Sequence, residues 1–565
     1  MIKNNSARSA SPLQVRSAGP LVAGIIFTLF TLFLSIVSAP GAYSQGGALD
    51  QLSSGGGSIS LPVPGWSPPA ADDSSAPSRA EPENIRLPEK SSASRESERI
   101  IRMSPEALAS ATPDQKIQML NTLIRDSRPN DNNNSGGNNW DQEKIEKAIL
   151  RVLDSAPDAA SFDYIYYRLK KDSLQYAVGW YKHIEDRLKA HRQSVVPGDW
   201  EALRQYVDTV SQSAHSGLNL IKFLIDGKEA MAEIDPVLKS AEKSIHIQVF
   251  QLQADNIGQG IADLLSAKAK AGLTVRLMID EYGSQAKHDE ALKIMLDSMR
   301  SNGIQVIVQK APFMKKHLDH RKVMVIDGKV GFTGGMNIGR LYQVEWHDQQ
   351  TLIEGPAVAK LQEAFVGRWK KAGGSIGAGE DLFPALEEYP GGARTQVIAH
   401  IGLRDQNIKA MYLRAIGTAQ ISIKIANPYF TDEDVVSALR KAARRGVKVQ
   451  LVLPQDNDVP IVQHASRHYY PKLVKAGVEV YEYKGRMAHE KVAVFDGRWS
   501  TFGSSNLDAR SLINNDELNL IITDPRIAED IETRLFDADL PNCELMNNYS
   551  PSLLDHMAHM VNGLL

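Results

Sequence analysis

Two stretches of the chain share one pattern: HRKVMVIDGKVGFTGGMN (320–337) and HEKVAVFDGRWSTFGSSN (489–506). Each begins with a His, carries a Lys two residues later, continues through four apolar residues to an Asp-Gly pair, and ends on an Asn. The agreement extends to an acid at the same offset, Asp348 in the first copy and Glu517 in the second. Two occurrences with matched downstream positions indicate an internal repeat rather than coincidence.

Each copy predicts a buried strand that ends in a tight turn. The runs Val323–Ile326 and Val492–Phe495 are fully apolar, which suits strands covered on both faces. The Asp-Gly pairs that follow predict hairpin turns. Because side chains two residues apart on a strand share a face, we expect the His and Lys of each copy to point the same way.

An imidazole, an ammonium and an amide at one place suit the chemistry of phosphodiesters. Lys and Asn side chains donate hydrogen bonds to the non-bridging oxygens, where negative charge builds up in the transition state. One His attacks phosphorus, and the other protonates the leaving oxygen and then activates the acceptor. A neutral imidazole needs an acceptor at its second ring nitrogen, and we predict that Asp348 and Glu517 fill this role. The predicted site residues are His320, Lys322, His489 and Lys491, with Asn337 and Asn506 for phosphate binding.

Two further groups of residues were candidates for a place near the site. Asp327 and Asp496 follow the buried strands, and we place them behind the site with a mainly structural role, paired with a Lys or Arg. His317 and His320 are three residues apart and could share a helical face around zinc. Cys543 is the only cysteine, no His-Glu-x-x-His occurs, and no tight cluster repeats in the second copy. We therefore predict no metal and no cofactor, with His317 solvated or behind the site.

The two copies resemble the phospholipase D superfamily, and most closely its bacterial cardiolipin synthase-like branch. The resemblance covers about residues 215–535 and includes DGKE (226–229), AEKSIHIQVF (241–250), AGLTVRLMID (271–280), NPYF (427–430) and GSSNLDARS (503–511). It implies that His320 is the nucleophile and His489 the general acid and base. It also implies that Lys322, Lys491, Asn337 and Asn506 bind phosphate, and that Asp348 and Glu517 orient the imidazoles.

The N-terminus predicts export. Lys3, Arg8 and Arg16 precede an apolar run at residues 21–37, and Ala42-Tyr43-Ser44 would suit cleavage. Residues 1–44 are therefore expected to be a cleaved signal peptide, with an uncleaved anchor as the alternative. Either one places the catalytic region outside the cytoplasm, periplasmic or extracellular.

The remaining sequence divides by composition and pattern. Residues 45–100 predict a disordered linker, and 101–212 a helical region of unknown role. Its aromatics, with neighbouring Lys and Arg, could face anionic lipid, but we expect a helical core (Tyr164, Tyr166, Tyr167, Tyr176, Trp180 and Tyr181). Half 1 spans residues 213–371, a connector spans 372–394, and half 2 spans 395–535. A tail at 536–565 is expected to carry a short amphipathic helix that docks on the body.

Alternating strands and helices predict an α/β fold. We expect two pseudo-symmetric α/β/α halves with mainly parallel mixed sheets, which share one active-site cleft. The formal net charge is −3, so no global basic field favours nucleic acid. The leading function is phosphatidyl transfer between phospholipids at a membrane surface, from phosphatidylglycerol to cardiolipin. The alternatives are an exported phospholipase D that releases phosphatidic acid, and a metal-independent nuclease. The acceptor and the oligomeric state stay open.

Overall fold

The computed structural model describes residues 92–126, 139–173, 195–310 and 317–561. The predicted signal segment (1–44) and most of the predicted linker lie outside these ranges. In the part of the chain that is described, no helix combines the length and apolar character needed to cross a membrane.

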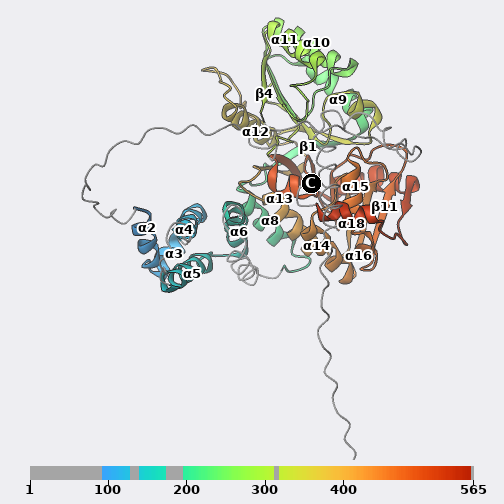
Figure 1. Cartoon of the computed structure of the whole chain (residues 1–565). Helices are drawn as coiled ribbons and strands as arrows, with labels where there is room; N and C mark the ends of the chain where they lie inside the picture. The colour runs from blue at the N-terminus through green and yellow to red at the C-terminus, as the bar shows by residue number, and fades with distance from the viewer. Residues whose placement is uncertain (1–91, 127–138, 174–194, 311–316, 562–565) are drawn as a thin grey trace, which may run out of the picture. The chain divides into compact units, whose positions relative to one another are not determined.

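The N-terminal region is helical, as predicted. Its helices are α2 (Ser92–Ile101), α3 (Pro105–Ser110), α4 (Pro113–Asp126), α5 (Asn139–Asp154), α6 (Ala159–Ser173) and α8 (Trp200–Ser211) (Figure 1). The prediction of disorder up to residue 100 is wrong at its end, because α2 begins at Ser92 and buries Ile100 in the core. Tyr164 and Tyr166 are buried, so the expected aromatic core is confirmed for these two. The side chains of the other four aromatics lie outside the described residues.

The first half alternates helices and strands up to the repeated motif. Its elements are β1 (Leu218–Ile225), α9 (Asp226–Ser240), β2 (Ser244–Val249), α10 (Asn256–Lys270), β3 (Thr274–Asp280), α11 (Glu290–Ser301), β4 (Gln305–Gln309), β5 (Val323–Ile326), β6 (Val330–Gly334), η1 (Leu341–Glu345), β7 (Gln349–Glu354) and α12 (Ala357–Lys371).

The second half repeats this order and adds a C-terminal extension. Its elements are β8 (Ala393–His400), α13 (Asn407–Thr418), β9 (Ser422–Ala426), α14 (Glu433–Arg444), β10 (Lys448–Pro454), α15 (Pro460–Arg467), α16 (Tyr470–Val474), β11 (Val478–Tyr483), β12 (Val492–Phe495), β13 (Trp499–Gly503), η2 (Arg510–Asn514), β14 (Glu517–Thr523), α17 (Pro525–Ile531), η3 (Glu532–Asp537), η4 (Leu540–Asn542), β15 (Cys543–Leu545) and α18 (Leu553–Met560).

The strands of both halves form one mixed sheet, in the order β15-β11-β10-β9-β12-β13-β14-β8-β1-β7-β6-β5-β2-β3-β4. The α/β class and the two similar halves are confirmed, but they share a continuous sheet through the antiparallel pair β1–β8. The expectation of mainly parallel sheets needs correction. Parallel pairing is confined to β2–β3–β4 and to β9–β10–β11, and the other neighbours are antiparallel.

The repeated motif accounts for part of the antiparallel strand pairing. In each copy the strand after the Lys turns back at its Asp-Gly pair and forms a hairpin, β5–β6 or β12–β13. Asp327 and Gly328 have φ of 54° and 66°, and Asp496 and Gly497 have φ of 51° and 60°. The register pairs Ile326 with Val330 and Phe495 with Trp499, so each loop has three residues, and its first two have the positive φ that Gly adopts readily and Asp tolerates.

Asp327 and Asp496 do not lie behind the site, and this corrects their predicted place. Asp327 Oδ1 accepts hydrogen bonds from the backbone N–H groups of Lys243 (2.7 Å) and Ser244 (2.8 Å). Asp496 Oδ1 does the same for Ile421 (2.7 Å) and Ser422 (2.9 Å). Both carboxylates thus hold the chain where it enters β2 or β9, at the end of the motif strand away from the His. Their partners are backbone amides rather than the expected Lys or Arg.

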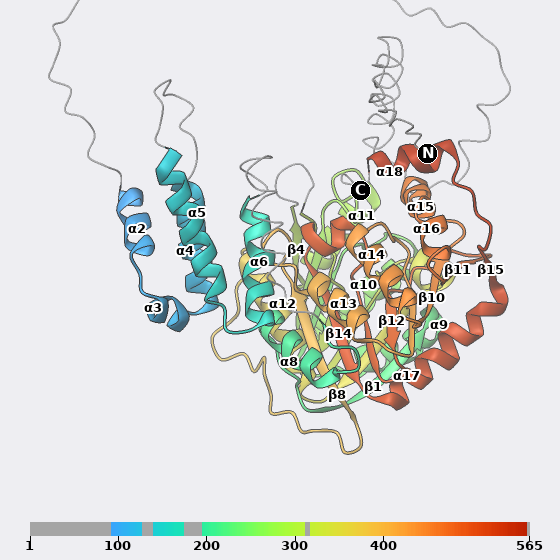
Figure 2. The same ribbon diagram turned by 90° about the horizontal axis from the view of Figure 1, so that it is seen from below.

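The C-terminal segment extends half 2 beyond residue 535, because β15 pairs with β11 at the edge of the sheet. Helix α18 docks beside α15, as expected (Figure 1, Figure 2). The docking face differs from the predicted apolar one: Leu553 and Met560 are 76% and 77% exposed. A buried polar contact holds the helix instead, since Asp555 Oδ1 lies 2.6 Å from His464 Nδ1.

Candidate active site

The two motifs meet because each is hydrogen-bonded to the other half. Parallel bridges join Asp319 to Asp516 and His347 to Ala488. The backbone N–H of His320 donates to the carbonyl of Asp516 (2.9 Å), and that of His489 donates to the carbonyl of His347 (2.6 Å). Each motif His is therefore positioned by the chain that leads into the last motif strand of the opposite half, β14 or β7.

The imidazole–acid pairs also cross between the halves. His320 Nδ1 lies 3.0 Å from Glu517 Oε1, and His489 Nδ1 lies 2.7 Å from Asp348 Oδ2. Both carboxylates are fully buried. The predicted contact of the acids with the imidazoles is present, with the acid of one copy serving the His of the other. Because a carboxylate occupies Nδ1 of each imidazole, Nε2 is the ring nitrogen that is available to react.

Lys322 and Lys491 are buried beside their histidines. Lys322 Nζ donates to the carbonyl of His320 (2.6 Å), and Lys491 Nζ donates to that of His489. Burial lowers the pKa of Lys322 to about 7 and that of Lys491 to about 8. A bound anion would favour the charged form of both. The pair is thus suited to receive a phosphodiester.

The two asparagines lie at the ends of the motif hairpins. Asn337 is 2% exposed, lines one pocket together with Lys322, and accepts the backbone N–H of Gln251 at Oδ1 (3.0 Å). This bond fixes the orientation of its amide. Asn506 is also buried, and among the described residues its Oδ1 has no hydrogen-bond partner.

The two imidazole–acid pairs differ in the acid itself and in the hydrogen-bond donor beside it. Ser504 Oγ donates to Glu517 Oε2 (2.5 Å). The corresponding residue in the first copy is Gly335, where an added Cβ would lie 2.2 Å from Asp348 Oδ1. Asp348 consequently receives no hydroxyl there and accepts the backbone N–H of Gln349 instead (2.8 Å).

The two pairs also differ in protonation, and the Ser504 hydroxyl is one of several causes. Burial opposes ionisation of Glu517, but His320, Lys322 and Ser504 outweigh it and lower its pKa. Burial raises the pKa of Asp348 to about 7. Burial also lowers the pKa of His320 to about 4, and burial with Lys491 and Lys322 holds the pKa of His489 well below its usual value.

Several contacts around the imidazoles were not predicted from the sequence. Phe250 meets His320 edge-on with ring centroids 4.9 Å apart, and Trp346 lies at the same distance from His489. Gln349 Nε2 donates to the carbonyl of Gly503 (3.2 Å) and so links β7 to the other motif. Phe250 ends the stretch 241–250 and Trp346 stands two residues before Asp348, but their positions in the sequence did not show which imidazole they would contact.

His317 lies behind the site, one of the two places expected for it. Its Nε2 is 2.6 Å from Asp516 Oδ1, and Asp516 precedes Glu517. The His317 ring therefore contacts the residue that precedes Glu517, the partner of His320. It does not form a pair with His320 itself. A different group of metal-ligand type is formed by His347, Glu490 and Asp539.

Comparison with known proteins identifies the family. The family model described as "Cardiolipin synthase, PLD-like domain" matches residues 234–369 and 412–539. A probable cardiolipin synthase of Bacillus subtilis is 32% identical over 354 residues, which is 60% of this chain and 69% of that protein. A cardiolipin synthase of Alkalihalophilus pseudofirmus is 38% identical over 313 residues, 53% of this chain and 61% of that protein.

A solved structure shows the same fold. The crystal structure of a phosphatidylserine synthase from Haemophilus influenzae superposes with a TM-score of 0.53 at 14% identity, and the match covers 65% of this chain and 99% of that one. The repeated motif, the crossed imidazole–acid pairs and these matches agree with one another. The chain belongs to the phospholipase D-like cardiolipin synthase family, whose members are phosphodiester-transferring enzymes.

Proposed function

We propose that this protein transfers a phosphatidyl group from one phospholipid to another, as a cardiolipin synthase does with phosphatidylglycerol. The observation that carries the proposal is the crossed pairing of His320 with Glu517 and of His489 with Asp348, which makes one site with two imidazoles. The similarity to cardiolipin synthases supports the lipid substrate.

His320 is the proposed nucleophile. Glu517 is the better ionised of the two acids, and a carboxylate at Nδ1 fixes the tautomer that leaves the Nε2 lone pair free. His320 Nε2 attacks phosphorus, the Nε2–P bond forms, and the bond from phosphorus to the leaving glycerol oxygen breaks. The side chains proposed to hold the non-bridging oxygens are Lys322, Lys491, Asn337 and Asn506.

His489 is the proposed acid and base. Because the pKa of Asp348 is raised to about 7, the Asp348–His489 pair holds an extra proton near neutral pH. His489 Nε2 delivers that proton to the leaving oxygen. It then takes a proton from the hydroxyl of a second phosphatidylglycerol, whose oxygen attacks phosphorus and breaks the Nε2–P bond. The environments of the two pairs thus assign opposite roles to two like residues.

Water is the competing acceptor, and its use would make the enzyme a phospholipase D. The burial of the site favours a lipid acceptor, since His320 and His489 are only 8% and 4% exposed. We further infer that the site works at a membrane surface outside the cytoplasm, from the charge and apolar pattern of residues 1–44. A nuclease activity is the weaker alternative because the chain has no basic excess.

The first prediction concerns the product. Purified protein on liposomes of phosphatidylglycerol should form diphosphatidylglycerol and release glycerol, as measured by mass spectrometry of the lipids. Phosphatidic acid as the main product would replace the transferase with the hydrolase. Cleavage of DNA or RNA without any lipid product would contradict the lipid substrate altogether.

The second prediction separates the two histidines. With a p-nitrophenyl phosphodiester donor, whose leaving group needs no proton, His489→Ala should still accumulate phosphohistidine on His320, detected by mass spectrometry. On phosphatidylglycerol the same variant should lose about 10²–10⁴-fold in kcat, the usual contribution of general acid–base catalysis. His320→Ala should give no covalent adduct with either donor. An adduct on His489 in the His320→Ala variant would reverse the assignment.

The third prediction is a pH profile. The nucleophile is active above the pKa of His320, about 4, and the acid is active below that of the Asp348 pair, about 7, so kcat/KM should fall below and above these values. Attack also needs Glu517 as the carboxylate that holds the Nδ1 proton of His320, so the acidic limb depends on the ionisation of Glu517 as well. Ser504→Ala removes a hydroxyl that lowers the pKa of Glu517, so that pKa should rise and only the acidic limb should move, to higher pH. A shift of the alkaline limb instead would show that Glu517 serves the acid rather than the nucleophile.

A further inference from the structure

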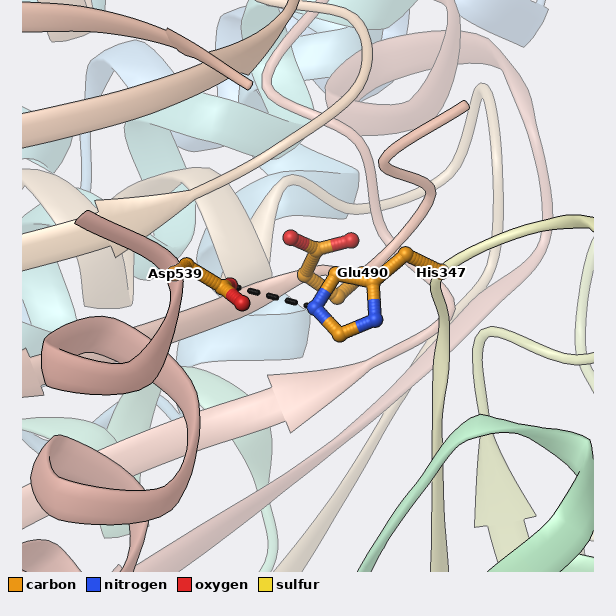
Figure 3. Close-up of side chains that lie close together, drawn as sticks. All are labelled: His347, Glu490 and Asp539. Atoms are coloured by element: carbon orange, nitrogen blue, oxygen red, sulfur yellow. Dashed lines mark hydrogen bonds and ion pairs between the residues drawn. The ribbon is translucent and has the colours of Figure 1, made fainter. Parts of the chain in front are cut away.

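A second cluster of metal-ligating side chains lies immediately behind the site. His347 precedes Asp348, Glu490 follows His489, and Asp539 comes from the segment between η3 and η4. One ligand atom of each of the three lies within 4.8 Å of the other two, and all three residues are buried. Figure 3 shows both carboxylates next to the imidazole, with Asp539 joined to one ring nitrogen.

The imidazole of this cluster is held as metal-binding histidines are held. His347 Nδ1 lies 2.7 Å from Asp226 Oδ1, and Arg486 donates to the other oxygen of Asp226 (2.6 Å). His347 Nε2 faces Asp539 Oδ2 at 3.1 Å. Ligating histidines commonly give their second ring nitrogen to a carboxylate, which fixes the ring and its tautomer.

Glu490 is the side chain that the described contacts leave unexplained. It is 1% exposed, and neither of its carboxylate oxygens has a hydrogen-bond partner among the described residues. The side chain is directed into the cluster (Figure 3). A buried carboxylate without donors is costly, and a cation bound at this point would remove the cost.

The first repeat shows what normally fills the equivalent place. Glu490 corresponds to Arg321, and His347 corresponds to Asp516, by their offsets from the motif histidines. Around the first motif two guanidiniums meet two carboxylates: Arg321 and Arg368 lie 3.0 and 2.7 Å from Asp319, and 3.6 and 3.4 Å from Asp516. Around the second motif a carboxylate, Glu490, takes the place of Arg321, and an imidazole, His347, takes the place of Asp516.

Three carboxylates (Asp226, Glu490 and Asp539) meet one guanidinium, Arg486, in this cluster. Without an ion, protons balance the charges: burial opposes protonation of His347, but the surrounding carboxylates raise its pKa to about 11, and burial raises the pKa of Glu490 to about 7. A divalent ion would replace these protons and leave His347 neutral and Glu490 ionised. We propose that His347 Nε2, Glu490 and Asp539 bind one divalent transition-metal ion. One imidazole nitrogen and two carboxylates suit Zn²⁺ or Mn²⁺.

Such an ion would be structural and would not touch the reacting atoms. It would join half 1 through His347, half 2 through Glu490 and the C-terminal extension through Asp539. Since His347 and Glu490 are the chain neighbours of Asp348 and His489, the ion would hold that pair in register. The site is independent of the substrate proposed above.

The test uses the full chain, freed of metal by a chelator and titrated with Zn²⁺. Calorimetry and elemental analysis should give one equivalent per chain, with a raised Tm, because a ligand that binds only the folded state stabilises it. Glu490→Gln should lose this equivalent and the Tm response. His347→Arg should lose them too, because it keeps a positive charge but removes the ligating nitrogen.

A matched control tests whether histidines elsewhere in the chain bind the added Zn²⁺. His468 Nδ1 and His556 Nδ1 are 3.1 Å apart and could themselves bind Zn²⁺. His556→Ala should therefore leave the proposed equivalent intact, and its loss in this variant would overturn the proposal. So would wild-type protein that binds no Zn²⁺, or equal binding by wild type and His347→Arg. If Glu490→Gln does not fold, Asp539→Asn serves in its place.

Discussion

Each imidazole of the site depends on a carboxylate from the opposite half, and the rest of the structure serves this exchange. Glu517 reaches His320 and Asp348 reaches His489, so neither half alone contains a complete imidazole–acid pair. The exchange requires the halves to be fixed relative to each other within a fraction of an ångström. The shared sheet through β1–β8 and the backbone bonds from His320 and His489 provide that rigidity.

Duplication builds two equal sets of groups, whereas the chemistry needs two different ones. The structure resolves this with small differences between the two copies of the motif, at positions other than the shared His, Lys and Asn. Ser504 gives Glu517 a hydroxyl donor, and Gly335 withholds one from Asp348 because no side chain fits there. The same logic extends to Arg321 and Glu490, which stand at equivalent positions and carry opposite charges. A repeat can thus keep its geometry while its two copies acquire separate protonation states.

Much of this could be predicted from the sequence because it depends on local rules. Apolar runs, Asp-Gly turns and matched offsets identified the motif strands, the hairpins and the acids that contact the imidazoles. The crossing of the pairs could not be predicted, since equal offsets say nothing about which copy supplies which acid. Asp327 shows a second limit of the prediction. A carboxylate that follows a strand can pair with a Lys or Arg or can accept hydrogen bonds from backbone amides, and only the fold shows which of these it does. Helix α18 shows the same limit: the sequence predicted a docked amphipathic helix, but only the fold shows that Asp555 makes the contact and that Leu553 and Met560 stay exposed.

The crossed pairing is tested most directly by nuclear magnetic resonance of protein labelled with ¹⁵N at the histidine rings. Glu517→Gln should shift the Nδ1 resonance of His320 and leave that of His489 in place, and Asp348→Asn should do the reverse. The two signals are assigned by their loss in His320→Ala and His489→Ala. If Glu517→Gln shifts His489, or Asp348→Asn shifts His320, each half holds its own pair and the account of one shared site is contradicted.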